Sequence, residues 1–167
     1  MLQAGDWAFV FANIDYLLEG AVVTVGLTIA ALGLGFALGF PAGAIEVYGD
    51  GVLRRLVSGA GVVLRGTPIV VIMLMLFFVV SISQSAFVTA TVGLGLRSAA
   101  YQAQIFRGAL QSVDEGQLEA ARAIGMSRFE AIRHVVVPQA LRRSMPGFQN
   151  EFTIVLKDTS IAFAIGL

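Results

Sequence analysis

The chain has 167 residues, of which 57% are hydrophobic and 13% charged, and its formal net charge is zero. Soluble domains carry about 25% charged residues, so this composition excludes an ordinary soluble fold, and the balanced charge gives no reason to expect nucleic-acid binding. Cysteine is absent, which excludes disulfides and cysteine metal sites, and one histidine, His134, cannot build a histidine-rich site, so we expect no metal or cofactor.

Four apolar segments predict an all-α integral membrane protein. They cover about residues 17–45, 56–82, 86–105 and 147–167. Each is long enough to cross a bilayer as a helix, which takes about 20 residues. In the second segment, Thr67 is interpreted as an N-cap and Pro68 as the first helical residue. The sequence stops within apolar residues, so we expect that it is cut short and that a further span follows.

The placement of arginine predicts the orientation of these spans. No Lys or Arg precedes the first span, and the loop between the second and third spans is uncharged. The other two loops carry Arg54, Arg55, Arg122, Arg128, Arg133, Arg142 and Arg143. Because cytoplasmic loops carry the excess of basic residues, we expect the N-terminus outside and the long loop, about residues 109–146, in the cytoplasm.

A stripe of small residues follows one face of the first predicted span. Ala31, Gly35, Gly39 and Gly43 are spaced four residues apart, which places them on the same side of a helix. Small residues let two helices approach closely in lipid, where apolar contact alone gives little driving force. We therefore expect this stripe to be a helix-packing face rather than a chance enrichment in glycine.

The long loop is predicted to begin with a short capped helix. Ser112 and Glu115 fit a capping box that opens a helix over about residues 114–124. Gly125 suits the left-handed position that ends such a helix. The pair Ala120–Ala121 leaves little side-chain bulk on this helix. That pair fits either a knob that enters a groove in a partner or simple helix propensity, because alanine is the best helix former.

A second capped helix is predicted directly after the glycine. Ser127 and Glu130 repeat the capping-box pattern. We expect this helix to stop near Pro138, because proline disfavours helical geometry at the preceding residue. A bland linker does not need two tailored helix starts, so the loop is predicted to be a structured helix–glycine–helix unit.

The loop resembles the EAA signature of ABC-importer membrane subunits, in the branch that carries polar amino acids. The signature is matched in spacing by Glu119, Ala120, Ala121, Gly125, Val135, Val137 and Pro138. Further stretches resemble this branch in the same order, namely residues 64–69, 98–101, 105–109, 138–146 and 150–160. Several ordered motifs over residues 64–167 make the resemblance far more specific than a single short pattern.

The resemblance implies a type I ABC-importer transmembrane domain, with residues 1–167 forming one domain. The family has five spans, of which four are visible here. It implies a coupling helix in which Glu119, Ala120, Ala121 and Gly125 contact an ATPase subunit dimer. It also implies a second permease subunit, identical or related, and an extracytoplasmic binding protein that delivers an amino acid. No phosphate-binding loop is present, so the chain itself is not expected to hydrolyse ATP or to be an enzyme.

Charged residues in the fourth span mark a candidate substrate pathway. Glu151 and Asp158 are seven residues apart and share a helix face, so together they could hold an ammonium group. Charges at membrane depth cost about 2.5–3.5 kcal/mol each, so they usually have a purpose or a partner. In the amino-acid branch these positions resemble a substrate-contacting pair. The alternatives are a structural ion-pair network and, for Glu151, a position at the cytoplasmic interface.

Arg97 and Tyr101 in the third span are further pathway candidates. Arg97 could meet a substrate carboxylate, contact Gln104 or pair with Asp158, and pairing is the favoured interpretation. Tyr101 is either a packing residue or part of the pathway. A passive channel or membrane scaffold is the alternative function, but it does not explain the paired caps and the EAA spacing. We therefore expect a multi-pass protein of the cell membrane that imports an amino acid.

Overall fold

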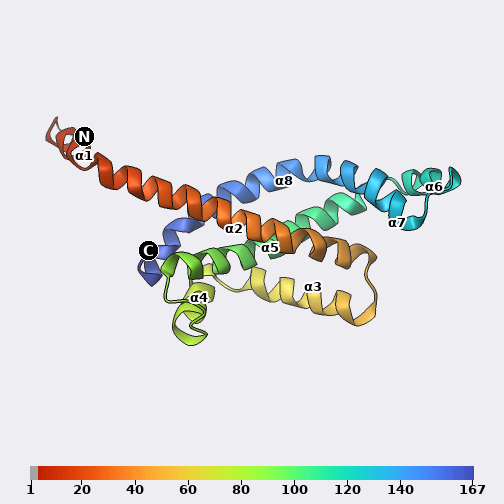
Figure 1. The fold of residues 1–167 in the computed structure, drawn as a ribbon, viewed down its shortest axis with the longest axis horizontal. Coiled ribbons are helices and arrows are strands. Elements are labelled where there is room, and N and C mark those ends of the chain that lie inside the picture. Colours follow the sequence, from red (N-terminus) through yellow and green to blue (C-terminus); the bar gives the residue numbers. More distant parts are fainter. Residues whose placement is uncertain (1–3) are drawn as a thin grey trace.

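The computed structural model describes residues 4–167, and within this range the chain is largely helical and contains no strand (Figure 1). The helices of this range are α1 (Ala4–Ala12), α2 (Ile14–Tyr48), α3 (Gly51–Gly66), α4 (Ile69–Leu74), α5 (Ala86–Gln111), α6 (Glu115–Ala123), α7 (Arg128–Ala131) and α8 (Val137–Asp158). Wide π-helical turns occupy Met75–Val79 and Ile132–Val136, and a tight 3-10 segment, Thr159–Ile165, follows α8. The predicted all-α fold is confirmed.

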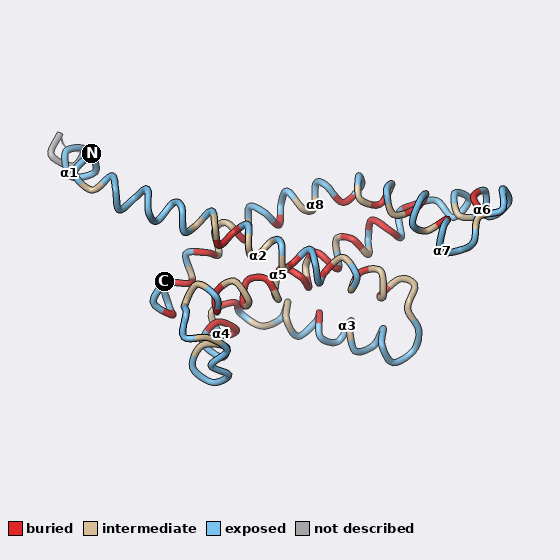
Figure 2. Tube along the Cα trace, viewed as in Figure 1, coloured by how far each residue is buried: buried red, intermediate tan, exposed pale blue. Residues whose placement is uncertain are grey.

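Helix α5 is the centre of the molecule, and α2, α3 and α8 pack around it. Thirteen of its 26 residues are buried, and many of these are small or polar. Figure 2 shows this burial along most of α5, whereas α3 exposes most of its length. Arg65 near the end of α3 adds a polar tie, since its Nη1 donates to the carbonyl of Ala100 at 2.9 Å.

The helices that correspond to the four predicted apolar spans differ in how apolar they are. Among the described residues, α2 is long and apolar enough to cross a membrane, and the bent pair α3–α4 is a second candidate if it counts as one span. Helices α5 and α8 have 26 and 22 residues but are too polar for the same criterion. At 1.5 Å per residue they measure about 39 and 33 Å, so their length suffices. Some of their polar residues, such as Ser98, Gln102 and Glu151, are buried between helices, which is why apolar composition alone is a poor guide to them.

The second predicted span is broken at its proline. Helix α3 and the segment Ile69–Val79 meet at 105°. The hydroxyl of Thr67 donates to the carbonyl of Val63 at 2.8 Å and thereby caps the end of α3, while Pro68 is the N-cap of α4. The expectation that Thr67 caps the following helix is therefore wrong. Because proline disfavours helical geometry at the residue before it, Thr67 is extended and closes the preceding helix instead.

The small-residue stripe of α2 is a packing face against α5, as predicted. Ala31, Gly35, Gly39 and Gly43 are all buried. A Cβ atom built on Gly39 would lie 2.6 Å from the carbonyl oxygen of Ala99, and one on Gly43 would lie 2.7 Å from another α5 carbonyl oxygen. Real Cβ atoms do not approach oxygen so closely, so the crossing of α2 and α5 requires glycine.

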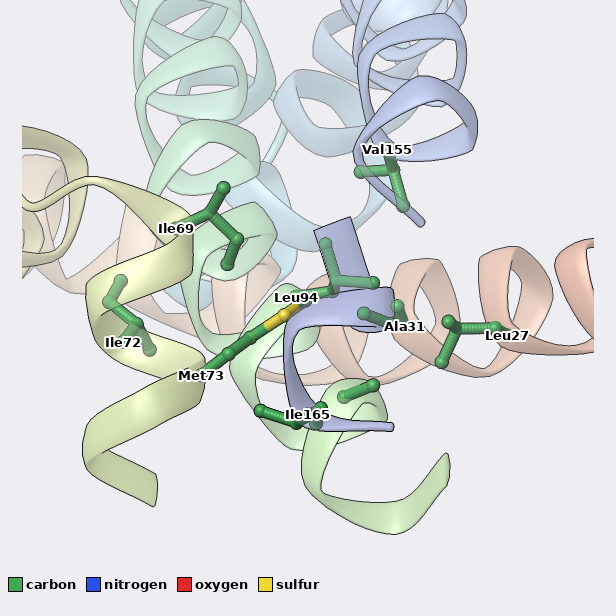
Figure 3. Close-up of a cluster of buried hydrophobic side chains, with 10 residues drawn as sticks. Leu27, Ala31, Ile69, Ile72, Met73, Leu94, Val155 and Ile165 are labelled. Carbon is green, nitrogen blue, oxygen red and sulfur yellow. The ribbon is translucent and has the colours of Figure 1, made fainter. Parts of the chain in front are cut away.

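Two apolar clusters hold the helices together at opposite ends of α5. The first cluster, part of which appears in Figure 3, joins α2, α4, α5, α8 and the 3-10 segment through Leu27, Ala31, Ile69, Ile72, Met73, Ala90, Leu94, Val155, Ala162 and Ile165. The second cluster, here named the loop-side cluster, consists of Phe106, Ala109, Leu110, Val113, Val136 and Ala140. It joins the end of α5 to the start of α8 and therefore supports the α6–α7 unit.

Candidate functional site

Helices α6 and α7 protrude at the end of the molecule opposite α1 (Figure 1). Helix α6 opens on Asp114, whose carboxylate accepts from the backbone N–H of Gly116 at 2.8 Å. Ser112 belongs to the end of α5, and its hydroxyl donates to the carbonyl of Ala109 at 2.7 Å. The predicted capping box at Ser112 and Glu115 is wrong, because Ser112 keeps helical backbone angles whereas an N-cap is extended.

The turn between α6 and α7 agrees with its prediction. Gly125 has a φ of 94°, in the left-handed region that favours glycine. The N–H of Met126 donates back to the carbonyl of Ala121 at 3.2 Å, which completes a Schellman-type helix end. Ser127 and Glu130 form both bonds of a capping box at the start of α7. Glycine and cap together set a sharp, defined corner between the two helices.

The predicted helix stop at Pro138 is wrong. The chain stays helical from α7 through the π turn Ile132–Val136 into α8, and Pro138 lies in the first turn of α8. In a regular α-helix its ring would clash with the carbonyl four residues earlier. The wider π turn directly upstream relieves this clash, so the helical path continues. Helix α8 therefore connects the protruding unit directly to the centre of the bundle.

The predicted coupling residues divide into exposed and buried positions. Three of them are exposed, namely Glu119, Ala120 and Gly125. Ala121 is buried, with 4% of its surface exposed, and packs within the chain. Ile124 and Phe129 border the same corner and are 77% and 70% exposed. The sequence reasoning missed both of these residues, although apolar side chains beside a glycine corner in a polar loop are a recognisable signal of a contact surface.

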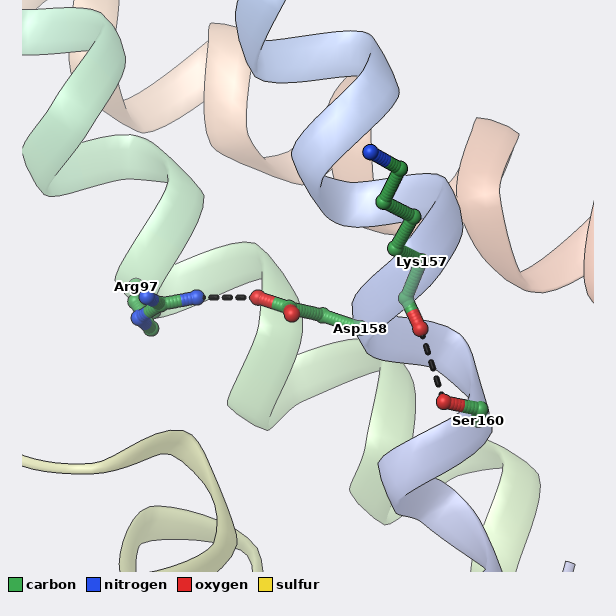
Figure 4. A network of polar contacts seen from close by, with 4 residues as sticks. All are labelled: Arg97, Lys157, Asp158 and Ser160. Atoms are coloured by element: carbon green, nitrogen blue, oxygen red, sulfur yellow. Dashed lines mark hydrogen bonds and ion pairs between the residues drawn. The ribbon is translucent and has the colours of Figure 1, made fainter.

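Arg97 and Asp158 form an ion pair that joins α5 to α8 (Figure 4). The Arg97 guanidinium also lies over the ring of Tyr101, 5.2 Å from its centroid. In Figure 4 the Lys157 side chain extends away from this pair. The favoured interpretation of Arg97 as the partner of Asp158 is confirmed, and Gln104 is exposed on another part of α5. The arrangement brings three of the predicted pathway residues together.

Glu151 lies two helical turns before Asp158 on α8. Only 3% of its surface is exposed. It borders a cavity of about 430 Å³ between α2, α5 and α8. The cavity is lined by Leu32, Gly33, Phe36, Gln102, Phe148, Glu151 and Phe152. Asp158 pairs with Arg97 and does not line this cavity, but it lies close enough for its charge to act on Glu151.

The other residues that line this cavity were not predicted from the sequence. Three phenylalanine side chains line the cavity together with the single carboxylate, and the rings of Phe36 and Phe148 meet edge-to-face with centroids 6.0 Å apart. Gln102 donates to the hydroxyl of Ser98 at 3.0 Å and to the carbonyl of Leu32 at 3.3 Å. An apolar wall with one buried carboxylate can bind an organic cation. Among residues 4–167, no group of three or more His, Asp or Glu is placed to hold a metal ion.

Comparison with known proteins identifies the family of the chain. The model of the family described as "binding-protein-dependent transport system inner membrane component" matches residues 31–167. The chain is 36% identical over 167 residues to the glutamine transport system permease protein GlnP of Escherichia coli strain K12, covering 97% of this chain and 76% of that protein. It is 35% identical over 168 residues to the probable amino-acid permease protein YxeN of Bacillus subtilis strain 168, covering 97% and 75%.

Solved structures support the same assignment. A crystal structure of an amino acid ABC transporter with histidines superposes with a TM-score of 0.82 at 31% identity, over 94% of this chain and 76% of that chain. An inward-facing structure of the MetNI methionine ABC transporter gives a TM-score of 0.78 at 24% identity, over 90% and 74% of the two chains, and supports the fold. The chain belongs to the family of binding-protein-dependent transport system inner membrane components, the permease subunits of ATP-driven ABC importers.

Proposed function

We propose that this permease carries a polar amino acid and receives the energy of ATP hydrolysis through α6. The relatives above are a glutamine permease and a probable amino-acid permease, which supports an amino acid as the substrate. The observation that carries the coupling role is the position of α6, which protrudes from the bundle between two firm helix ends. A helix that projects from the bundle and has capped ends is suited to transmit force from a partner.

The docking surface on this unit consists of the exposed side of α6 and the corner that follows it. Glu119 and Ala120 present one small and one charged side chain to a partner. Ile124 and Phe129 add apolar contact area at the corner. Ala121 is buried, so its role in coupling is to let α6 pack closely on the adjoining α7 and π turn. The partner is an ATPase subunit dimer, and ATP is hydrolysed there rather than in this chain.

The pathway role rests on the cavity beside Glu151. A free amino acid carries an ammonium group, which a buried carboxylate attracts and which aromatic ring faces also favour. Glu151 supplies the carboxylate, and Phe36, Phe148 and Phe152 supply the rings. The Arg97–Asp158 pair with Tyr101 is the second polar element of the pathway. An arginine that can exchange its partner is suited to a substrate carboxylate.

The proposed membrane orientation rests on the distribution of basic residues. The segment 109–146, which includes the protruding unit, carries five of the eleven Lys and Arg residues and faces the cytoplasm, while the N-terminus lies outside. The ends of the molecule are arranged accordingly, since α1 and α6 lie at opposite ends (Figure 1). On the outer side the permease receives the substrate from an extracytoplasmic binding protein. A second permease subunit, identical or related, completes the membrane pathway.

Co-purification with the ATPase subunit tests the coupling role. The variant Glu119→Lys reverses the charge of the docking helix and is expected to lower the yield of bound ATPase at least ten-fold. Glu19→Lys makes the same charge change on the exposed surface of α2, far from α6, and serves as the control. Undiminished association of Glu119→Lys would refute the role of α6 in docking.

Substrate uptake by the reconstituted importer tests the pathway role. Glu151→Gln keeps the shape of the side chain but removes its charge, so uptake is expected to fall at least ten-fold while ATPase association stays intact. Asn150→Ala, an exposed neighbour on α8, is the control and should transport normally. If Glu151→Gln combined with Asp158→Asn transports like the wild type, the carboxylates have no substrate role. Uptake without the ATPase subunit would instead support a passive channel, which the family match does not favour.

A further inference from the structure

Two polar ties fasten the start of α8 to the segment that leads into α6. The Nη1 of Arg143 donates to the backbone carbonyl of Ser112, and it also lies 3.2 Å from the hydroxyl of that residue. One turn earlier on α8, the side-chain amide of Gln139 donates to Gln117 of α6 at 3.4 Å. Positions four apart share a helix face, so both ties leave the same side of α8.

The Ser112 carbonyl is a favourable target for an arginine. Ser112 is the C-cap of α5, and the last carbonyls of a helix have no partner within the helix. They also carry the negative end of the helix dipole, which attracts a cation. Arg143 therefore satisfies an acceptor that α5 leaves open. The bond holds α8 to the end of α5, two residues before Asp114 opens α6.

Apolar contacts lie directly beneath these ties. Val113, the residue between Ser112 and Asp114, is buried with 7% of its surface exposed. It belongs to the loop-side cluster together with Val136 and Ala140, which flank the first turn of α8. The junction between α5 and α6 thus packs on α8 through an apolar contact, and the hydrogen bond from Arg143 holds it there.

Helix α8 then runs without interruption toward the candidate pathway. Arg143 and Asp158 are fifteen residues apart on one helix, which corresponds to about 22 Å. At the far end, Asp158 pairs with Arg97 of α5. We propose that Arg143 is a positioning residue that locks the α5–α6 junction to α8, so that a displacement of α6 is delivered to the Glu151–Asp158 end of α8. This inference rests on the coupling role proposed for α6.

Charge-matched variants at neighbouring positions test this role. Arg143→Gln removes the lock, whereas Arg142→Gln makes the same change about 100° around the helix, also at an exposed position. The complex with the ATPase and a substrate-loaded binding protein is reconstituted for each variant. For Arg143→Gln we expect wild-type ATPase association, basal ATP hydrolysis within two-fold of wild type, and at least a ten-fold lower number of substrates transported per ATP. Arg142→Gln should match the wild type, and Arg143→Lys, which keeps a cationic donor, should restore part of the coupling.

These measurements distinguish the positioning role of Arg143 from an effect on ATPase docking and from an effect on folding. Failure of Glu119→Lys to weaken ATPase association refutes docking, whereas the Arg143 experiment is read within complexes that have assembled. Wild-type coupling in Arg143→Gln overturns the proposal. The proposal is also overturned if Arg142→Gln loses as much coupling as Arg143→Gln. It is overturned as well if Arg143→Gln loses both ATPase association and basal ATP hydrolysis, because that pattern marks a general structural role.

A cross-link between the two helices gives an independent test. The chain has no cysteine, so Gln117→Cys with Gln139→Cys introduces a single pair whose native side chains touch. If α6 and α8 move as one body, a short thiol cross-linker leaves transport unchanged and restores coupling in the Arg143→Gln background. Inhibition of wild-type transport by the cross-link would show that α6 must move relative to α8 and would overturn the proposal.

Discussion

The glycine-lined crossing of α2 and α5 offers the sharpest stability prediction. Gly39→Ala adds a Cβ atom that would lie 2.6 Å from the carbonyl oxygen of Ala99, on the backbone of α5. A backbone oxygen cannot rotate away as a side chain can, so the two helices must separate. Overpacking of this kind costs about 1–3 kcal/mol, and we take the upper end because backbone must move. The better helix propensity of alanine returns about 1 kcal/mol, which leaves a net loss of about 2 kcal/mol.

The control for this experiment lies on the same helix. Gly33 is exposed, and a Cβ atom there meets nothing within 4 Å, so Gly33→Ala has the propensity gain without the clash. Thermal unfolding in detergent, followed by far-UV circular dichroism, should place the midpoint of Gly39→Ala roughly 4–8 °C below the wild type. Gly33→Ala should unfold at or slightly above the wild-type midpoint. If the two variants unfold together, close packing at the stripe does not stabilise the fold.

Three further predictions concern charges and turns. Asp158→Asn should lower the free energy of unfolding by about 2 kcal/mol, since the pair, whose side chains are 21% and 20% exposed, is worth less than a fully buried one. Adding Arg97→Gln should recover most of this loss in the same unfolding assay. The Ser127 hydroxyl and backbone N–H hold the pKa of Glu130 below its ordinary 4.5. The start of α7 is therefore fully stabilised above pH 4.5 and loosens as the pH falls through the lowered pKa, which hydrogen exchange should report. Ser127→Ala removes the hydroxyl but keeps the N–H, so it should weaken this dependence without abolishing it. Gly125→Ala should cost about 1–2 kcal/mol because φ is 94°, and limited proteolysis should then cut the turn faster than in the wild type.

Features set by local chemistry could be predicted from the sequence alone. The Ser127–Glu130 cap and the Gly125 turn depend on a few neighbouring residues, and both are present as expected. The α2 stripe was predictable because four-residue spacing fixes one helix face whatever lies beside it. Pairing of Arg97 with Asp158 was the favoured alternative because two charges at membrane depth stabilise each other.

Features that depend on tertiary contacts could not be predicted in the same way. Ser112 was predicted to cap α6, but α5 continues up to this residue and keeps it helical. The N-cap of α6 is therefore Asp114. The cavity beside Glu151 draws Phe36 from α2 and Phe148 from α8, and no spacing rule within one helix relates them. The two prolines also could not be told apart from the sequence. The chain bends by 105° at Pro68, whereas at Pro138 a π turn directly upstream lets the helix continue.

The continuity of α8 is itself a product of its neighbours. Pro146 lies inside this helix, where a proline removes one backbone hydrogen bond and usually produces a kink. The next residue, Gly147, presses on α5, because a Cβ atom there would lie 2.6 Å from Cγ2 of Ile105. A helix that carries force from α6 to Asp158 would bend at its weakest point unless that point were supported. The close contact with α5 supplies this support at the adjacent residue, so under the coupling role proposed for α6 a displacement of the α6 end of α8 reaches Asp158 as movement rather than as bending.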